Sequence, residues 1–287
     1  MWLIFAVISA FFAGVSSILA KAGISRADSN LCTALRTSVV LIFSWLMVFI
    51  TGAQSGVADV GLRTLCFLLL SGICTGCSWI CYFKALSIGD VNRVVPIDKS
   101  STILTIILSF ILFQETVSIG RLAALLLLGA GIFLMIEKKP SDKKEPNGRG
   151  WFFYAAASAL FASLTTIFGK LGVTGVNSDL GSAIRTSAAL IFAWALVIAT
   201  RKVGEIRKID RKSWLFILLS GIATGASWLC YYRALSDGVT SAVVAIDKLS
   251  LLITIGFAVI VFKEKLSRRA LIGLVLICAG TLLMTFA

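Results

Sequence analysis

Residues 71–86 read SGICTGCSWICYFKAL, and residues 220–235 read SGIATGASWLCYYRAL. The two stretches lie 149 positions apart, and the slightly longer windows 69–87 and 218–236 share 14 of 19 residues. The same offset superposes further polar positions, namely Lys21 on Lys170, Arg36 on Arg185, Asp98 on Asp247, Lys99 on Lys248, and Glu115 on Glu264. The chain therefore contains an internal duplication.

The composition around this repeat is that of a membrane protein. Of the 287 residues, 58% are hydrophobic and only 14% are charged, whereas soluble domains carry about 25% charged residues. Apolar runs of roughly 18 to 23 residues, long enough to cross the bilayer as helices, separate the charges. There are ten such runs, at 2–20, 31–50, 62–84, 91–113, 119–137, 151–169, 180–200, 213–234, 240–262 and 268–286. We predict an all-α membrane protein of ten transmembrane helices, the first of them a retained helix and not a cleaved signal peptide.

Each copy of the repeat holds five of these runs. Because five is odd, the second copy enters the membrane in the opposite orientation, which predicts two inverted five-helix repeats, a recurrent transporter architecture. We assign the first repeat to residues 1–137 and the second to 151–287. Between them, KKPSDKKEPNGRG at 138–150 is rich in proline, glycine and charge and is read as a basic linker.

The net charge of +13 is concentrated in short loops. The loops after the odd-numbered runs hold 19 of the 27 Lys and Arg residues, a distribution that sets orientation and favours anionic lipid head groups over nucleic acid as the partner. This bias places the linker in the cytoplasm and both termini outside. We expect a multi-pass protein of the bacterial inner membrane, either a monomer or a homodimer.

The repeated stretch places hydroxyl groups on one helical face. Ser71, Thr75, Ser78 and Tyr82 fall within about 60° of each other, with Trp79 beside them. The second copy has the same pattern, in Ser220, Thr224, Ser227, Trp228 and Tyr231. Two interpretations stay open: the hydroxyls and the GxxxG pairs of these helices hold helices together, or the hydroxyls and aromatic rings line a cavity.

The cysteines of the first copy suggest a Cys-x2-Cys-x3-Cys motif. Cys74 and Cys77 are replaced by Ala223 and Ala226 in the second copy, however, so these positions require a small apolar side chain and not a thiolate. We therefore expect neither a metal site nor a cofactor.

The fourth and ninth runs each carry an aspartate followed by a lysine. Ionisable groups within a transmembrane segment are costly and commonly mark a functional site. Asp98 shares a helical face with Thr102 and Thr105, and Asp247 shares one with Thr254. Neighbours on a helix point about 100° apart, so we expect crossed ion pairs between the repeats. These would join Asp98 to Lys248 or Arg185, and Asp247 to Lys99 or Arg36. One interpretation is a structural ion-pair network, and the other is binding of a substrate or a coupling proton.

In their order, these motifs resemble the EamA family of the drug/metabolite transporter superfamily. The residues that carry the resemblance are LRTS at 35–38 with IRTS at 184–187, the SGxxTGxSWxxYxxALS signature, PIDKSS with AIDKLS, and FQETVS with FKEKLS. The resemblance implies a ten-helix bundle around a central cavity lined by helices 3, 4, 8 and 9, and transport of small metabolites, often efflux of amino acids. Members of this family are usually drawn with cytoplasmic termini, contrary to the charge distribution here.

These observations together predict a secondary active transporter, an exporter or exchanger, of a small polar metabolite such as an amino acid, with proton coupling or substrate exchange. We expect no enzymatic activity; a channel, a non-transporting scaffold and an intramembrane enzyme are the alternatives. The predicted substrate-binding residues are Ser71, Thr75, Ser78, Trp79, Tyr82, Thr102, Thr105, Ser220, Thr224, Ser227, Trp228, Tyr231 and Thr254. The predicted proton-coupling or ion-pair residues are Asp98, Lys99, Asp247, Lys248, Arg36 and Arg185.

Overall fold

The computed structural model describes residues 1–23, 29–88, 91–135, 150–261 and 267–287, and within these ranges all regular structure is helical. The predicted linker, apart from Gly150, and Glu264 lie outside the described residues. The first repeat consists of α1 (Trp2–Gly23), α2 (Ser29–Ile50), η2 (Ala53–Val57), α3 (Leu62–Ile88), α4 (Val91–Lys99), α5 (Ser101–Leu112) and α6 (Ile119–Met135). The second consists of α7 (Gly150–Val173), α8 (Ser178–Ala199), η3 (Val203–Lys208), α9 (Arg211–Asp237), α10 (Thr240–Asp247), α11 (Ser250–Val261) and α12 (Arg268–Phe286).

These helices confirm an all-α membrane protein: eight of the described helical segments are long and apolar enough to cross a membrane, and α6 is a shorter apolar helix. Two of the ten predicted spans are not single helices. The runs 91–113 and 240–262 are each interrupted just after the Asp-Lys pair. At the interruptions, Ser100 N–H donates to Ile97 O at 3.1 Å and Leu249 N–H donates to Ile246 O at 2.9 Å. These i to i−3 bonds tighten one turn and break the regular α-helical ladder. Spans four and nine are therefore α4–α5 and α10–α11.

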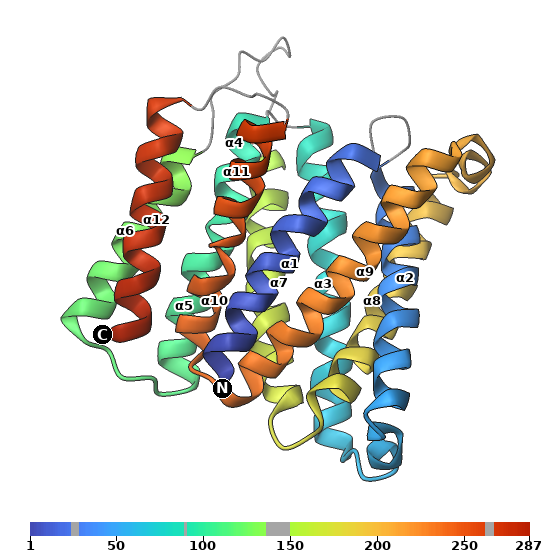
Figure 1. Ribbon diagram of the computed structural model, residues 1–287, viewed down its shortest axis with the longest axis horizontal. Helices are drawn as coiled ribbons and strands as arrows, with labels where there is room; N and C mark the ends of the chain where they lie inside the picture. The colour runs from blue at the N-terminus through green and yellow to red at the C-terminus, as the bar shows by residue number, and fades with distance from the viewer. Residues whose placement is uncertain (24–28, 89–90, 136–149, 262–266) are drawn as a thin grey trace.

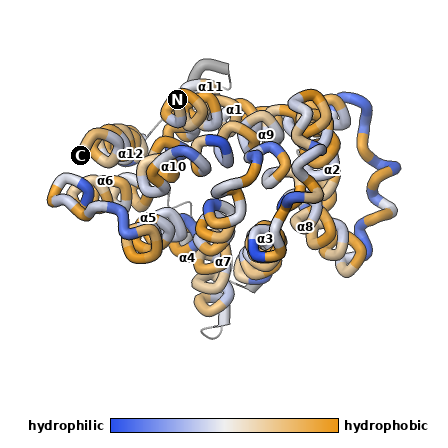
Figure 2. The backbone as a smooth tube through the Cα atoms, turned by 90° about the horizontal axis from the view of Figure 1, so that it is seen from below, coloured by the Kyte–Doolittle hydropathy of each residue, from blue (hydrophilic) through white to orange (hydrophobic). Residues whose placement is uncertain are grey.

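The two repeats interlock across a pseudo-twofold axis. α1 of the first repeat packs along α9 of the second, and α7 packs along α3 in the equivalent way. α2 pairs with its own counterpart α8, and α6 with α12, and these two pairs lie at opposite ends of the molecule (Figure 2). Figure 1 shows both termini at the lower end, with α4 and α11 higher than α5 and α10. The second repeat is thus inverted relative to the first.

The glycines of the repeated stretch permit this interlocking. A methyl group at Gly221 would lie 2.6 Å from Cβ of Val39, and one at Gly225 would lie 2.6 Å from Cδ1 of Phe43. Gly72 and Gly76 face Ala188 and Phe192 of α8 in the same way. The GxxxG pairs therefore set the close contacts of α9 with α2 and of α3 with α8.

Candidate functional site

A line of buried serines joins α1 to α9 and α3 to α7. Ser227 donates its hydroxyl hydrogen to Ser9 O at 3.0 Å, and Ser78 donates to Ser158 O at 3.1 Å. The two bonds are equivalent under the 149-residue offset. These serines therefore hold helices together, as the first interpretation of the hydroxyl face requires.

A second line of polar contacts lies one to two turns away. Ser220 donates to Ser16 O at 3.0 Å, and Ser71 donates to Thr165 O at 2.7 Å. Thr75 Oγ1 lies 3.3 Å from Thr165 Oγ1. Ser71 and Ser220 thus also serve the contacts between helices, whereas Thr75 additionally borders open space.

That open space is a cavity of about 260 Å³ between the repeats. α1, α3, α7, α8, α9 and α10 all contribute to its wall. The lining residues are Ala13, Thr75, Trp79, Thr165, Thr166, Arg185, Ser227, Trp228, Tyr231, Tyr232 and Asp247. Aromatic rings, hydroxyls and one charge of each sign therefore meet in a volume suited to a ligand smaller than a drug-sized molecule.

Arg185 is the most deeply buried charge of this cavity, with 2% of its surface exposed. Its Nε donates to Ser71 Oγ at 3.3 Å and its Nη2 to Thr75 Oγ1 at 3.0 Å. Its guanidinium carbon lies 4.8 Å from the ring centre of Trp228 and 4.5 Å from that of Tyr232. Nη1 is buried without a hydrogen-bond partner. Hydrogen bonds and ring contacts thus fix the guanidinium, while one of its amino groups has no hydrogen-bond partner.

Asp247 supplies the opposite charge, but its pairing corrects our prediction. Its carboxylate lies 3.1 Å from Nζ of Lys248, the next residue. Asp98 likewise lies 3.9 Å from Nζ of Lys99. None of the predicted crossed pairs, Asp98 with Lys248 or Arg185 and Asp247 with Lys99 or Arg36, occurs among the ion pairs of the described residues. The prediction was wrong because both pairs sit at a helix interruption, where a long lysine side chain can curl back to its neighbour.

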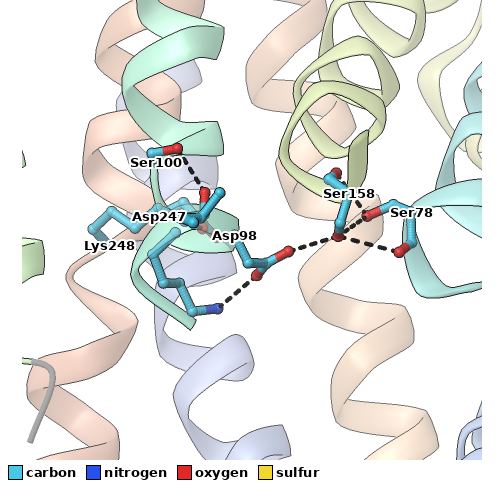
Figure 3. Close-up of polar contacts among 8 residues, drawn as sticks. Ser78, Asp98, Ser100, Ser158, Asp247 and Lys248 are labelled. Atoms are coloured by element: carbon cyan, nitrogen blue, oxygen red, sulfur yellow. Dashed lines mark hydrogen bonds and ion pairs between the residues drawn. The ribbon is translucent and has the colours of Figure 1, made fainter. Parts of the chain in front are cut away.

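The two aspartates differ in their second contact. Ser158 Oγ donates to Oδ1 of Asp98 at 2.8 Å, and Figure 3 shows Ser158 lying between Ser78 and Asp98. Asp247 instead lines the cavity. The duplicated carboxylates therefore occupy two different environments in one structure.

Several predicted site residues do not line this cavity. Thr102 and Thr105 are buried, and Thr105 donates to the carbonyl of Ser101 in its own helix at 2.7 Å. Thr254 donates in the same way to Ser250 O at 3.0 Å. Tyr82 packs beside a small cluster around Val94. Thr105 and Thr254 thus satisfy their hydroxyls within their own helices, where the sequence pattern suggested a cavity.

Lys99 and Arg36 are also absent from the cavity wall. The side chain of Lys99 is 57% exposed, compared with 25% for Lys248. Of the predicted ionisable residues, Arg185 and Asp247 alone line the cavity described above.

Our sequence reasoning missed four lining residues. Ala13, Thr165 and Thr166 come from the first helix of each repeat, whose polar positions we did not examine. The signal was present, because the offset relates Thr165 and Thr166 to Ser16 and Ser17. The fourth, Tyr232, corresponds to Phe83 in the first repeat and so carried no repeat signal.

Glu115 makes a contact between the repeats that the sequence did not indicate. Its carboxylate accepts hydrogen bonds from the backbone N–H groups of Thr240, at 2.7 Å, and Ser241, at 3.2 Å. These are orphan donors at the start of α10, and a carboxylate there also complements the helix dipole. Glu115 therefore anchors the half-helix that ends at Asp247.

Comparison with known proteins agrees with this architecture. The family model described as "EamA-like transporter family" matches residues 1–137 and 149–286. A relative from Sinorhizobium sp., named "Uncharacterized transporter in cobO 3'region", is 43% identical over 136 residues, which cover 47% of this chain and 96% of the relative. A crystal structure described only as that of a "protein" superposes with a TM-score of 0.76 at 19% identity, covering 99% of this chain and 98% of the other, a likeness of fold alone. The chain is thus a multi-pass membrane protein and belongs to the EamA-like transporter family of the drug/metabolite transporter superfamily.

Proposed function

We propose that this transporter is a secondary active carrier of a small zwitterionic metabolite, such as an amino acid or a related compound, and that it exports or exchanges its substrate by alternating access. The observation that carries the proposal is the unpartnered Nη1 of Arg185 in the same cavity as the carboxylate of Asp247. An arginine amino group and a carboxylate are the natural partners of a substrate carboxylate and a substrate ammonium.

Burial strengthens this argument. A buried hydrogen-bond donor that lacks a partner costs about 1–3 kcal/mol, and more when it is charged. A substrate carboxylate at Nη1 of Arg185 would relieve that cost in a site of low dielectric constant. The empty donor is therefore better explained by a ligand than by a purely structural ion-pair network.

The walls of the cavity fit the remainder of such a molecule. Trp79, Trp228 and Tyr231 offer apolar surface beside the hydroxyls of Thr75 and Ser227. Aromatic faces hold apolar groups and attract cations, so the same walls accept an apolar side chain and support the ammonium. A small number of oriented polar groups among apolar walls is typical of metabolite sites.

The chain contains no histidine, so a coupled proton would reside on a carboxylate, with Asp247 in the cavity as the first candidate. Exchange of one substrate for another is the alternative coupling. We place the carrier in the bacterial inner membrane with the 138–150 linker in the cytoplasm, as the charge distribution favours. Its partners in this proposal are the substrate and the lipid bilayer, and it acts as a monomer or homodimer without nucleic acid.

The test is counterflow of radiolabelled amino acids in proteoliposomes. Saturable exchange of unmodified substrate supports a carrier, non-saturating flux indicates a channel, and chemical conversion of the label indicates an enzyme. Arg185→Gln should lower the apparent affinity for substrate at least about tenfold, since a charge-assisted hydrogen bond contributes about 1.5–3 kcal/mol.

Arg233→Gln is the matched control, because Arg233 also lies over an aromatic ring, that of Phe5, but its side chain is 48% exposed and paired with Asp237. It should leave exchange unchanged. Equal effects of the two substitutions, or normal exchange by Arg185→Gln, would contradict the assignment of the carboxylate site.

A further inference from the structure

The two copies of one serine–aspartate arrangement adopt different states. α7 of the second repeat contacts α4 of the first, and α1 of the first contacts α10 of the second. The 149-residue offset relates Ser9 to Ser158 and Asp98 to Asp247. Ser158 donates to Asp98 at 2.8 Å. Both serines also approach the serine of the neighbouring helix, Ser158 Oγ lying 3.3 Å from Ser78 Oγ and Ser9 Oγ lying 3.2 Å from Ser227 Oγ. In the part of the chain that the structure describes, however, no hydrogen bond joins Ser9 to Asp247.

The duplicated arginines show the same asymmetry. Arg185 donates to the hydroxyls of Ser71 and Thr75. The corresponding bonds from Arg36 to Ser220 and Thr224 are absent among the described residues, although both pairs of hydroxyls make equivalent contacts, with α7 and with α1 respectively. Arg185 and Asp247 consequently line the cavity, whereas their copies do not.

Two repeats with the same arrangement of helices, in opposite orientations, can exchange these conformations. The exchange produces a state of similar energy in which the cavity faces the other side of the membrane, as rocking of inverted repeats requires. The serines are preserved in both helices, so the donor needed for the exchanged state is already in place at Ser9.

We propose that Ser158 and Ser9 act as alternate positioning residues: in the opposite-facing state Ser9 binds Asp247, Ser158 releases Asp98, and Asp98 becomes the carboxylate of the substrate cavity. This inference rests on the proposed alternating access. It adds a second substrate-facing carboxylate, used in turn with Asp247, to the site described above.

The matched substitutions are Ser158→Ala and Ser9→Ala. Both retain the bond to the neighbouring helix, because Ser78 and Ser227 donate to the backbone carbonyls of Ser158 and Ser9, at 3.1 and 3.0 Å. The two variants differ in the hydrogen bond that they remove: Ser158→Ala removes the bond to Asp98, and Ser9→Ala removes the bond to Asp247 of the proposed opposite-facing state. A purely structural role of the serines would move both variants in the same direction.

Pulsed electron paramagnetic resonance in liposomes measures the populations of the two states from the distance between two spin labels. The labels are placed at Ser55 and Ile119, or at the equivalent Gly204 and Arg268. All four positions are exposed, and the labels are introduced into a protein whose seven native cysteines have been replaced. Each pair spans one end of the molecule.

Ser158→Ala should lower, and Ser9→Ala should raise, the ratio of the state whose distances match this structure to the opposite-facing state, each by about tenfold, as expected for loss of a hydrogen bond to a charged group. Asp98→Asn should shift the two states in the same direction as Ser158→Ala, and Asp247→Asn in the same direction as Ser9→Ala. Shifts of equal sign in the two serine variants, or no shift in either, overturn the proposal.

This readout is independent of substrate. Opposite shifts in a protein that fails to exchange amino acids would leave the serine switch standing and refute the substrate assignment. Normal amino-acid exchange together with shifts of equal sign in the two serine variants would refute the serine switch and leave the substrate assignment standing.

Discussion

Arg185 has two roles in the structure: it joins α8 to the hydroxyls of α3, and it lines the cavity. Ser71 and Thr75 fix one edge of its guanidinium, and two aromatic rings cover its faces. Arginine suits this task because its planar charge stacks on rings and donates along two edges at once. The same hydroxyls that we considered as either helix contacts or cavity lining therefore join helices and also hold the arginine of the cavity wall.

Asp247 is expected to bind the ammonium group of the substrate. Asp247→Asn should weaken binding of an α-amino acid about 10- to 100-fold, because it removes one charge-assisted contact of about 1.5–3 kcal/mol. Binding of the matching carboxylate without an amine should change little. Thermal-shift titrations with both ligands measure this difference.

Asp237→Asn is the control for that measurement, since Asp237 is paired with Arg233 at the end of α9, where its side chain is 40% exposed. An Asp247 variant that binds both ligands as the unmodified protein does would remove Asp247 from the site.

The interrupted helices are the elements that shape the cavity. α10 is only eight residues long, and it begins at the carboxylate of Glu115 and ends at Asp247. A continuous helix would carry Asp247 and Lys248 to different faces, whereas the interruption lets them pair beside the cavity. Discontinuous helices with a buried charge at the break recur in transporters because they expose polar groups without exposing backbone to lipid.

Close packing of α9 on α2 depends on Gly225. Gly225→Ala should lower the free energy of unfolding by about 1–3 kcal/mol, the usual cost of overpacking, because the new methyl group meets the ring of Phe43 at 2.6 Å. Gly204→Ala is the control, since no atom lies within 4 Å of the added methyl. Thermal unfolding in detergent compares the two. Equal melting temperatures would show that α2 and α9 can separate at no cost.

The whole molecule is organised by its inversion. Both termini lie on one side of the molecule, as Figure 1 shows, and many contacts made by one repeat have a counterpart at the opposite end. Trp194 donates to Ser38 at 3.1 Å, and Trp45 approaches Ser187 at 3.5 Å in the equivalent way. Small departures from this symmetry, such as the two aspartates, are therefore informative about the state of the carrier.

The orientation in the membrane can be tested with η2 and η3, which are equivalent loops at opposite ends. Basic residues surround η3, among them Arg207 and Lys208, whereas η2 contains none. The positive-inside rule therefore places η3 in the cytoplasm. In intact cells a membrane-impermeant maleimide should label Ser55→Cys, and should label Gly204→Cys only after permeabilisation. The reverse pattern would indicate the orientation usually drawn for the family.

The sequence by itself determined the membrane class, the ten spans and the inversion, because hydropathy, span length and an odd repeat are properties of the chain read in order. It also identified Arg185 and Asp247 as unusual, since buried charge is expensive in a bilayer. Only the tertiary structure decided which hydroxyls join helices, that Thr105 and Thr254 satisfy theirs within their own helices, and that Asp98 and Asp247 differ. The physical reason is that a helical face acquires a partner only when helices pack. Two copies of one pattern can pack in different states, and no local pattern records which copy occupies which state.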